Sequence, residues 1–130
     1  MTGRTPLPPL WSLGHQQSRY SYYPQERVLE IAERYRREGL PCDAIYLDIH
    51  YMDGYRLFTW DRERFPDPKG MAEKLRSMGF KLITIVDVGV KLDPLYPAFR
   101  EGVLGDYFVK KPNGDLYVGR VWRARAVYYV

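Results

Sequence analysis

The sequence predicts an α/β fold in which three parallel strands alternate with helices. Two observations support this prediction. Short apolar runs recur about 35 residues apart, which is the length of a strand plus a crossover helix, and helical patterns fill the intervals between them. The three runs are residues 10–13, 45–49 and 82–88. Strands connected in this way pair in parallel through right-handed crossovers.

The first helix is expected to begin near Pro24, because a proline in the first turn of a helix has no N–H to leave unpaired. Beyond it, apolar residues recur at the spacing of one helical face: Val28, Ile31, Ala32 and Tyr35. Gly39, followed by Pro41, is expected to end this helix.

The second helix is expected to follow Asp67, whose side chain can cap the first turn, with Pro68 directly behind it. The same spacing predicts its buried stripe: Met71, Ala72, Leu75 and Met78. Gly79 is expected to end this helix.

After the third apolar run the alternation of strand and helix stops. Residues 94–100 suit a short helix, and residues 107–109 and 116–118 flank Asn113 and Gly114, a pair that favours a two-residue hairpin turn. Residues 122–130 contain no turn signal. The sequence therefore predicts a C-terminal hairpin added to the three strands, rather than a further strand–helix repeat.

The length and composition are those of one globular domain. The chain has 130 residues, of which 45% are apolar and 28% are charged, so residues 1–130 are expected to form a single domain with its own core. No apolar run approaches the roughly 20 residues that span a bilayer, and the N-terminal residues do not form a secretory signal. A cytoplasmic location is expected.

Cys42 is the single cysteine, which excludes an internal disulfide and favours a reducing compartment. It lies just before the second apolar run. Nothing near it in the sequence would lower its pKa as reactive thiols require, so we expect a small inert residue in the core.

The net charge is +4, and the basic residues fall into two groups. The first expected helix interleaves charges of both signs, which indicates a solvated face: Glu30, Glu33, Arg34, Arg36, Arg37 and Glu38. The second group lies in the tail: Arg120, Arg123 and Arg125. Neither group belongs to a nucleic-acid-binding motif, so no nucleic-acid partner and no membrane partner are expected.

Each predicted strand delivers polar side chains to its carboxyl end, where parallel sheets bind polar ligands. The polar residues expected at these ends are His15, Gln17, Asp48, His50 and Asp87. Their recurrence after three strands predicts a functional face at this edge of the sheet.

Several motifs in this order resemble glycoside hydrolase family 31, the family of α-glucosidases and α-xylosidases. The resemblance runs from about residue 6 to residue 122 and includes six segments: residues 8–14 with 19–22, 47–54, 58–61, 65–68, 86–90 and 117–122. Residues 47–54 read Leu-Asp-Ile-His-Tyr-Met-Asp-Gly. The resemblance implies that the chain forms the first part of a catalytic (β/α)8 barrel.

The resemblance also implies a sugar-binding role for particular residues. Asp48 would bind hydroxyls of the non-reducing sugar, since a carboxylate accepts charge-assisted hydrogen bonds. Tyr20 and Trp122 would line the same pocket, because aromatic rings cover the C–H faces of a pyranose. Asp87 and His50 are further candidates for contact with an α-glucoside. No cofactor and no metal are implied.

The sequence departs from the family pattern at several positions. His50 stands where the family usually has a second Asp, Val88 where it usually has Pro, and Arg123 where Pro would follow Trp122. The family's nucleophile and acid/base, which must flank one bond at roughly 5–5.5 Å, would lie beyond residue 130. The catalytic residues are therefore unknown.

Two functions remain open from the sequence. One is a truncated α-glycosidase-like protein that hydrolyses O-glycosyl bonds of α-glucosides. The other is a non-catalytic barrel segment that self-associates and binds sugar weakly. In both cases a homo-oligomer is expected, because both edge strands of a three-stranded piece would expose unpaired backbone groups.

Each candidate residue also has a structural interpretation. Asp48 could cap the loop that follows it, and His50 could be a packed, hydrogen-bonded histidine. His15, Asp48 and His50 together could hold a metal, although no further ligand spacing supports this. Asp87 could orient a neighbouring group or bond to the backbone nearby, and Asp53 suits a turn.

Overall fold

The computed structural model of the chain describes residues 3–87, 89–121 and 124–128. The chain divides into two compact units. Unit 1 comprises Met1–Tyr51 and Arg62–Ile85, and unit 2 comprises Met52–Asp61 and Val86–Val130. The segment 52–61 therefore leaves unit 1 after the second strand and returns to it before the second helix.

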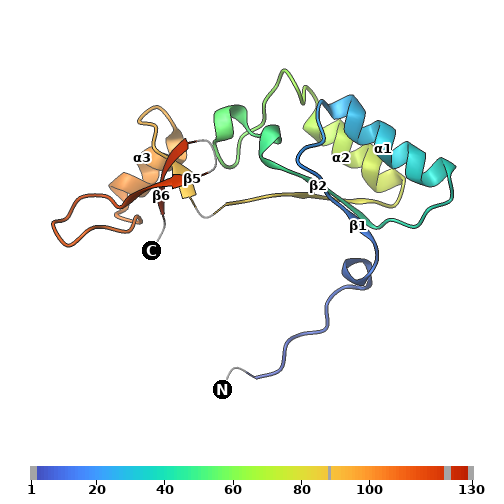
Figure 1. Cartoon of the computed structure of the whole chain (residues 1–130), viewed down its shortest axis with the longest axis horizontal. Helices are drawn as coiled ribbons and strands as arrows, with labels where there is room; N and C mark the ends of the chain where they lie inside the picture. The colour runs from blue at the N-terminus through green and yellow to red at the C-terminus, as the bar shows by residue number, and fades with distance from the viewer. Residues whose placement is uncertain (1–2, 88, 122–123, 129–130) are drawn as a thin grey trace. The chain divides into compact units, whose positions relative to one another are not determined.

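Unit 1 contains a three-stranded parallel sheet in the order β1-β2-β3, as the sequence predicts (Figure 1). Gln16 of β1 pairs with Ala44 of β2, and Ala44 pairs with Lys81 of β3. The elements of unit 1 are η1 (Leu10–Leu13), β1 (Gln16–Gln17), α1 (Gln25–Arg37), β2 (Ala44–Leu47), η2 (Ile49–Tyr51), α2 (Pro68–Ser77) and β3 (Lys81–Thr84).

The two helices of unit 1 lie side by side over the sheet (Figure 1). Two residues of each predicted stripe are buried: Val28 and Ala32 of α1, and Met71 and Leu75 of α2. Ile45 and Leu47 of β2 are buried as well. Fully burying a Val, Ile, Leu or Met side chain contributes about 1.5–3 kcal/mol, so this helix–sheet layer stabilises unit 1.

The start of α2 agrees with the sequence. The Asp67 carboxylate accepts a hydrogen bond of 2.9 Å from the Gly70 amide, and Pro68 is the first helical residue. The helix ends before Gly79, whose φ of +82° lies in the left-handed region that glycine adopts without strain.

The predicted first strand at residues 10–13 is wrong, because these residues form the 3-10 helix η1. Leu10 and Leu13 are 85% and 70% exposed, so this apolar run does not enter the core. The strand is formed instead by Gln16 and Gln17, whose side-chain oxygens accept hydrogen bonds from the hydroxyls of Tyr46 and Tyr35. Tyrosine hydroxyls thus donate hydrogen bonds to both glutamine side chains of β1, whereas an apolar first strand was expected.

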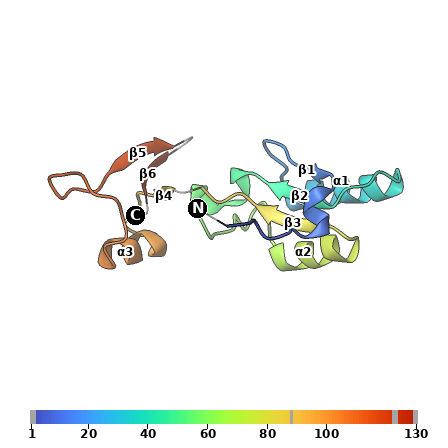
Figure 2. The same cartoon turned by 90° about the horizontal axis from the view of Figure 1, so that it is seen from below.

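Unit 2 contains an antiparallel sheet in the order β4-β6-β5 (Figure 2). Its elements are η3 (Asp53–Tyr55), β4 (Gly89–Lys91), α3 (Pro97–Leu104), β5 (Val118–Val121) and β6 (Ala124–Tyr128). Strands β5 and β6 are consecutive in the chain and pair antiparallel, which the sequence did not predict. The short helix begins at Pro97, three residues later than predicted.

The predicted turn at Asn113 and Gly114 also forms. The Gly114 amide donates to the Lys111 carbonyl, and Lys110 and Leu116 make an antiparallel bridge across the turn. This bridge is isolated. The longer antiparallel pairing in this part of the chain is between β5 and β6, in a tail that contains no turn signal.

Aromatic residues form the core of unit 2. The rings of Phe99 and Phe108 stack with their centroids 5.7 Å apart, and both residues are buried together with Val90 and Tyr96. Gly102 of α3 faces this stack, and a Cβ atom at this position would lie 2.2 Å from the Phe108 ring. Only glycine lets the helix approach the ring this closely.

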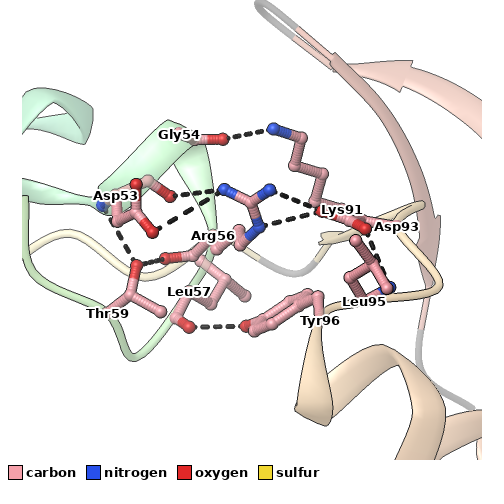
Figure 3. Close-up of polar contacts among 9 residues, drawn as sticks. All are labelled: Asp53, Gly54, Arg56, Leu57, Thr59, Lys91, Asp93, Leu95 and Tyr96. Carbon is pink, nitrogen blue, oxygen red and sulfur yellow. Dashed lines mark hydrogen bonds and ion pairs between the residues drawn. The ribbon is translucent and has the colours of Figure 1, made fainter.

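A polar cluster fastens the loop 52–61 within unit 2 (Figure 3). Arg56 donates to one oxygen of the Asp93 carboxylate from both Nε (2.9 Å) and Nη2 (2.5 Å). Lys91 donates to the Gly54 carbonyl, and the Tyr96 hydroxyl donates to the Leu57 carbonyl. These contacts join residues that are 37 to 39 positions apart in the sequence.

The charged face predicted for α1 is present. Arg27 pairs with Glu30 at 2.6 Å and Arg34 with Glu38 at 2.7 Å, with all four side chains largely exposed. The bond to Glu38 raises the pKa of Arg34. Among the described residues, no helix is both long enough and apolar enough to cross a bilayer.

Candidate functional site

Asp48 lies directly after β2, at the carboxyl end of the parallel sheet in unit 1. One of its carboxylate oxygens accepts a hydrogen bond of 2.7 Å from the Ile49 amide, so Asp48 does cap the loop that follows it. Within the part of the chain that the structure describes, its second oxygen accepts no hydrogen bond. The side chain is half-buried. A fixed carboxylate with one oxygen left over suits a ligand hydroxyl.

His50 lies two residues further on, in η2, and is 8% exposed. Its Nδ1 atom shares a hydrogen bond of 2.6 Å with the Ser21 hydroxyl. Its ring stacks on Tyr23 with a centroid distance of 5.0 Å and an interplanar angle of 24°. The structure thus shows the packed, hydrogen-bonded histidine that the sequence left open.

Tyr20 belongs to the loop that leads from β1 to α1, at the same end of the sheet. Its ring meets the His50 ring edge-on at 5.1 Å, and its side chain is 58% exposed. The loop is also tied to β1, because the Gln17 side-chain amide donates to the hydroxyl of the buried Tyr22. Tyr20, Asp48 and His50 are therefore gathered at one end of unit 1.

His15 does not reach this edge, so its predicted position is wrong. The strand begins after His15, and the His15 carbonyl accepts a hydrogen bond from the Asp43 amide at the amino end of β2. The five residue-to-residue steps from Asp43 to Asp48 correspond to about 16 Å of extended chain. The His15 imidazole contacts Tyr35 of α1 instead. Among the described residues, no group of three metal-ligating side chains forms.

The remaining candidates lie outside unit 1. Asp87 is half-buried and belongs to unit 2. Trp122 lies outside the described residues. Whether these two residues join Tyr20 and Asp48 around one ligand stays a prediction.

Cys42 is 4% exposed, and its thiol contacts the Ala44 carbonyl at 3.4 Å. Burial raises the pKa of this thiol above its ordinary value, which keeps it protonated and disfavours nucleophilic chemistry. The structure agrees with the expectation of an inert core residue.

Three residues at this site were not predicted from the sequence: Ser21, Tyr23 and Arg64. Ser21 and Tyr23 contact His50, and the Arg64 guanidinium lies 4.7 Å from the Tyr23 ring centroid. Ser21 lies within residues 19–22, which resemble the family only as a motif, and nothing in the sequence links Tyr23 or residue 64 to this site. The arrangement as a whole gathers a carboxylate and an exposed aromatic ring at one end of the sheet, which is a combination suited to a polyhydroxylated ligand.

Strands that alternate with helices, pair in parallel and carry polar residues at their carboxyl ends define part of a (β/α)8 barrel. The chain belongs to glycoside hydrolase family 31. The family model described as "Glycosyl hydrolases family 31 TIM-barrel domain" matches residues 5–129. The resemblance inferred from the motifs is thereby confirmed.

Curated relatives agree with this assignment. The chain is 49% identical over 128 residues to alpha-glucosidase 2 of Bacillus thermoamyloliquefaciens and 44% identical to an alpha-glucosidase of Saccharolobus solfataricus. Both matches cover 98% of this chain but only 16% and 18% of those proteins. The chain therefore spans less than a fifth of the length of these relatives.

Solved structures of the family share the fold. The family 31 alpha-glucosidase from Bacteroides thetaiotaomicron superposes with a TM-score of 0.86 at 42% identity, covering 98% of this chain and 22% of that one. A Flavobacterium johnsoniae GH31 dextranase complexed with glucose gives a TM-score of 0.87 at 31% identity, covering 98% and 16%. The glucosidase II alpha subunit gives 0.88 at 35% identity, covering 92% and 13%.

Proposed function

We propose that this chain forms the sugar-binding beginning of an α-glycosidase barrel and that it binds α-glucosides through Asp48. Tyr20, Trp122, Asp87 and His50 are proposed to belong to the same site. Residues of this chain are proposed to bind the sugar, and none of them is proposed as the nucleophile or the acid/base. Hydrolysis of the O-glycosyl bond would be the function of the whole enzyme.

The geometry of Asp48 supports this proposal most directly. Its backbone position is fixed by β2, and the Ile49 amide holds one carboxylate oxygen at 2.7 Å. A bound hydroxyl would meet a carboxylate that is already oriented, so little conformational entropy would be lost on binding. The membership of family 31 and the glucose complex of the dextranase relative point to a sugar as this ligand.

Binding of an aryl α-glucoside to the full chain, measured by calorimetric titration, tests this function. In Asp48→Asn, the amide oxygen can still accept the hydrogen bond from Ile49, but the negative charge is lost. Hydrogen bonds to charged groups contribute about 1.5–3 kcal/mol, so the affinity should fall about 10- to 100-fold. Wild-type affinity in this variant would contradict a sugar site at Asp48. Turnover of the same compound by the wild type would show that the chain is itself catalytic, and binding without turnover supports the non-catalytic alternative.

The alternative function is a non-catalytic barrel segment that self-associates and binds sugar weakly. One observation favours it. Within the described residues, β3 pairs on one side only, and Ile85 directly after it is 36% exposed. An edge strand of this kind offers unpaired N–H and C=O groups to another chain, so we propose a homo-oligomer that forms through this edge.

A further inference from the structure

Four side chains of unit 1 form a continuous stack at the carboxyl end of the sheet: Tyr20, His50, Tyr23 and Arg64. The Tyr20 ring meets His50 edge-on at 5.1 Å, His50 stacks on Tyr23 at 5.0 Å, and the Arg64 guanidinium lies 4.7 Å from the Tyr23 centroid. Three separate segments of the chain contribute to this stack, which we call the ring stack.

His50 is the central member of the ring stack. It is 8% exposed, while the two tyrosine rings that cover it are 58% and 41% exposed. A buried imidazole needs partners for its polar atoms, and Ser21 supplies one through its 2.6 Å bond to Nδ1. The loop that carries Tyr20 is therefore attached to His50 by one hydrogen bond and by two ring contacts.

The attachment has a consequence for Tyr20. A tyrosine that is more than half exposed would ordinarily sample several rotamers, and a ligand would have to select one of them. The edge contact with His50 favours one orientation of the ring before a ligand arrives. His50 lies in η2, two residues after Asp48. The Asp48 carboxylate and the Tyr20 ring that contacts His50 are therefore both held by the short segment 48–50.

We propose that His50 is a positioning residue that presents Tyr20 to the sugar bound at Asp48 without contacting the sugar itself. The identity of the ligand rests on the proposed function, whereas the effect of His50 on the orientation of the Tyr20 ring does not. Losing the preset ring orientation should weaken sugar binding about 3- to 10-fold, which corresponds to the ordering of one side chain.

The structural part is tested first in the full chain without sugar. Nuclear Overhauser contacts between the rings of Tyr20 and residue 50 are recorded by NMR in the wild type, His50→Ala and His50→Phe. His50→Phe keeps a ring in the stack and should retain the contacts with Tyr20. His50→Ala should shift the Tyr20 ring resonances and increase the motion of the ring.

His15→Ala is the matched control, because His15 is the other histidine of the chain and lies at the amino end of the sheet. This control should leave the Tyr20 resonances in place. Unchanged Tyr20 resonances in His50→Ala would overturn the inference, whatever the protein binds. If His50→Ala does not fold, His50→Phe and Ser21→Ala decide, because the first should keep and the second should weaken the order of the Tyr20 loop.

Titration with glucose then separates positioning from direct contact. His50→Ala should weaken binding in the wild-type background and have no further effect in Tyr20→Ala. An equal loss in both backgrounds would show that His50 contacts the sugar or acts elsewhere, and would overturn the inference. If the wild type binds no glucose, the proposed function fails, and the sugar-free NMR comparison still decides the role of His50.

Discussion

At the scale of single residues, Asp48 and His50 leave the same strand end but are held in different ways. Asp48 keeps one carboxylate oxygen on a backbone amide and is half-buried. His50 is buried by two tyrosine rings and bonded to a serine. The 3-10 helix η2 begins at Ile49, between the two residues, so His50 does not continue the strand that ends before Asp48.

Asp93 provides a prediction about pH. The Leu95 amide and the Arg56 guanidinium both donate to its carboxylate and hold its pKa below the ordinary value of 3.8. Since the folded pKa is the lower one, this carboxylate adds stability above its ordinary pKa, and this stability is lost as pH falls through the folded value. Thermal unfolding of the wild type should show this loss of stability at acid pH.

Asp93→Asn is the matching variant, because its amide oxygen can still accept from Leu95 while the charge is removed. It should be less stable than the wild type at neutral pH, and the two unfolding midpoints should converge at acid pH. A difference between the two proteins that stays constant down to the lowest pH would contradict this account of the ion pair with Arg56.

The position of Asp48 was predictable from the sequence, whereas its surroundings were not. An apolar run that ends in Asp48 specifies a buried strand and a polar terminus. The contacts of His50 with Ser21 and Tyr23, and of Tyr23 with Arg64, depend on how three separate segments pack. Sequence spacing carries no information about such contacts between segments that lie far apart in the chain.

At the scale of elements, the helices followed their local signals and the first strand did not. The cap of α2 and the buried Met71 and Leu75 of its stripe were predicted correctly, because capping and spacing act within a few residues. The apolar run at residues 10–13 does not identify its element, since a short apolar run suits several structures. The displacement of the first strand to Gln16 and Gln17 also moved His15 away from the predicted edge.

The cap of α2 provides a prediction at this scale. Asp67→Ala removes the acceptor of the Gly70 amide and should lower the free energy of unfolding by about 1 kcal/mol. Asp67→Asn keeps an acceptor and should cost less. Urea unfolding of both variants measures the difference. Equal losses in both variants would mean that the charge of Asp67, rather than its hydrogen bond, stabilises the helix.

At the scale of the whole molecule, the chain contains two compact units and an edge strand that pairs on one side within the described residues. The family 31 relatives are five or more times as long as the matched stretch, since it covers only 16% and 18% of them. The α-glucoside site and the self-association through β3 are therefore both proposals.

Self-association through β3 can be tested by a charge at its end. Ile85→Lys places a cation beside the unpaired edge, and positive charges on two copies would repel each other. Sedimentation should show an oligomer for the wild type and about 10-fold weaker association for this variant. Leu104→Lys, at an 85% exposed position of α3, is the control and should associate as the wild type does. Equal association of all three proteins would exclude this edge.

The central proposal is tested most directly by measuring how tightly two Asp→Asn variants bind glucose, one at each end of β2. Asp48 and Asp43 flank the same strand at opposite ends, and Asp→Asn makes the same chemical change at both. Calorimetric titration should show affinity reduced about 10- to 100-fold in Asp48→Asn and unchanged in Asp43→Asn. Wild-type affinity in Asp48→Asn, or an equal loss in Asp43→Asn, would contradict a sugar site at the carboxyl end of the sheet.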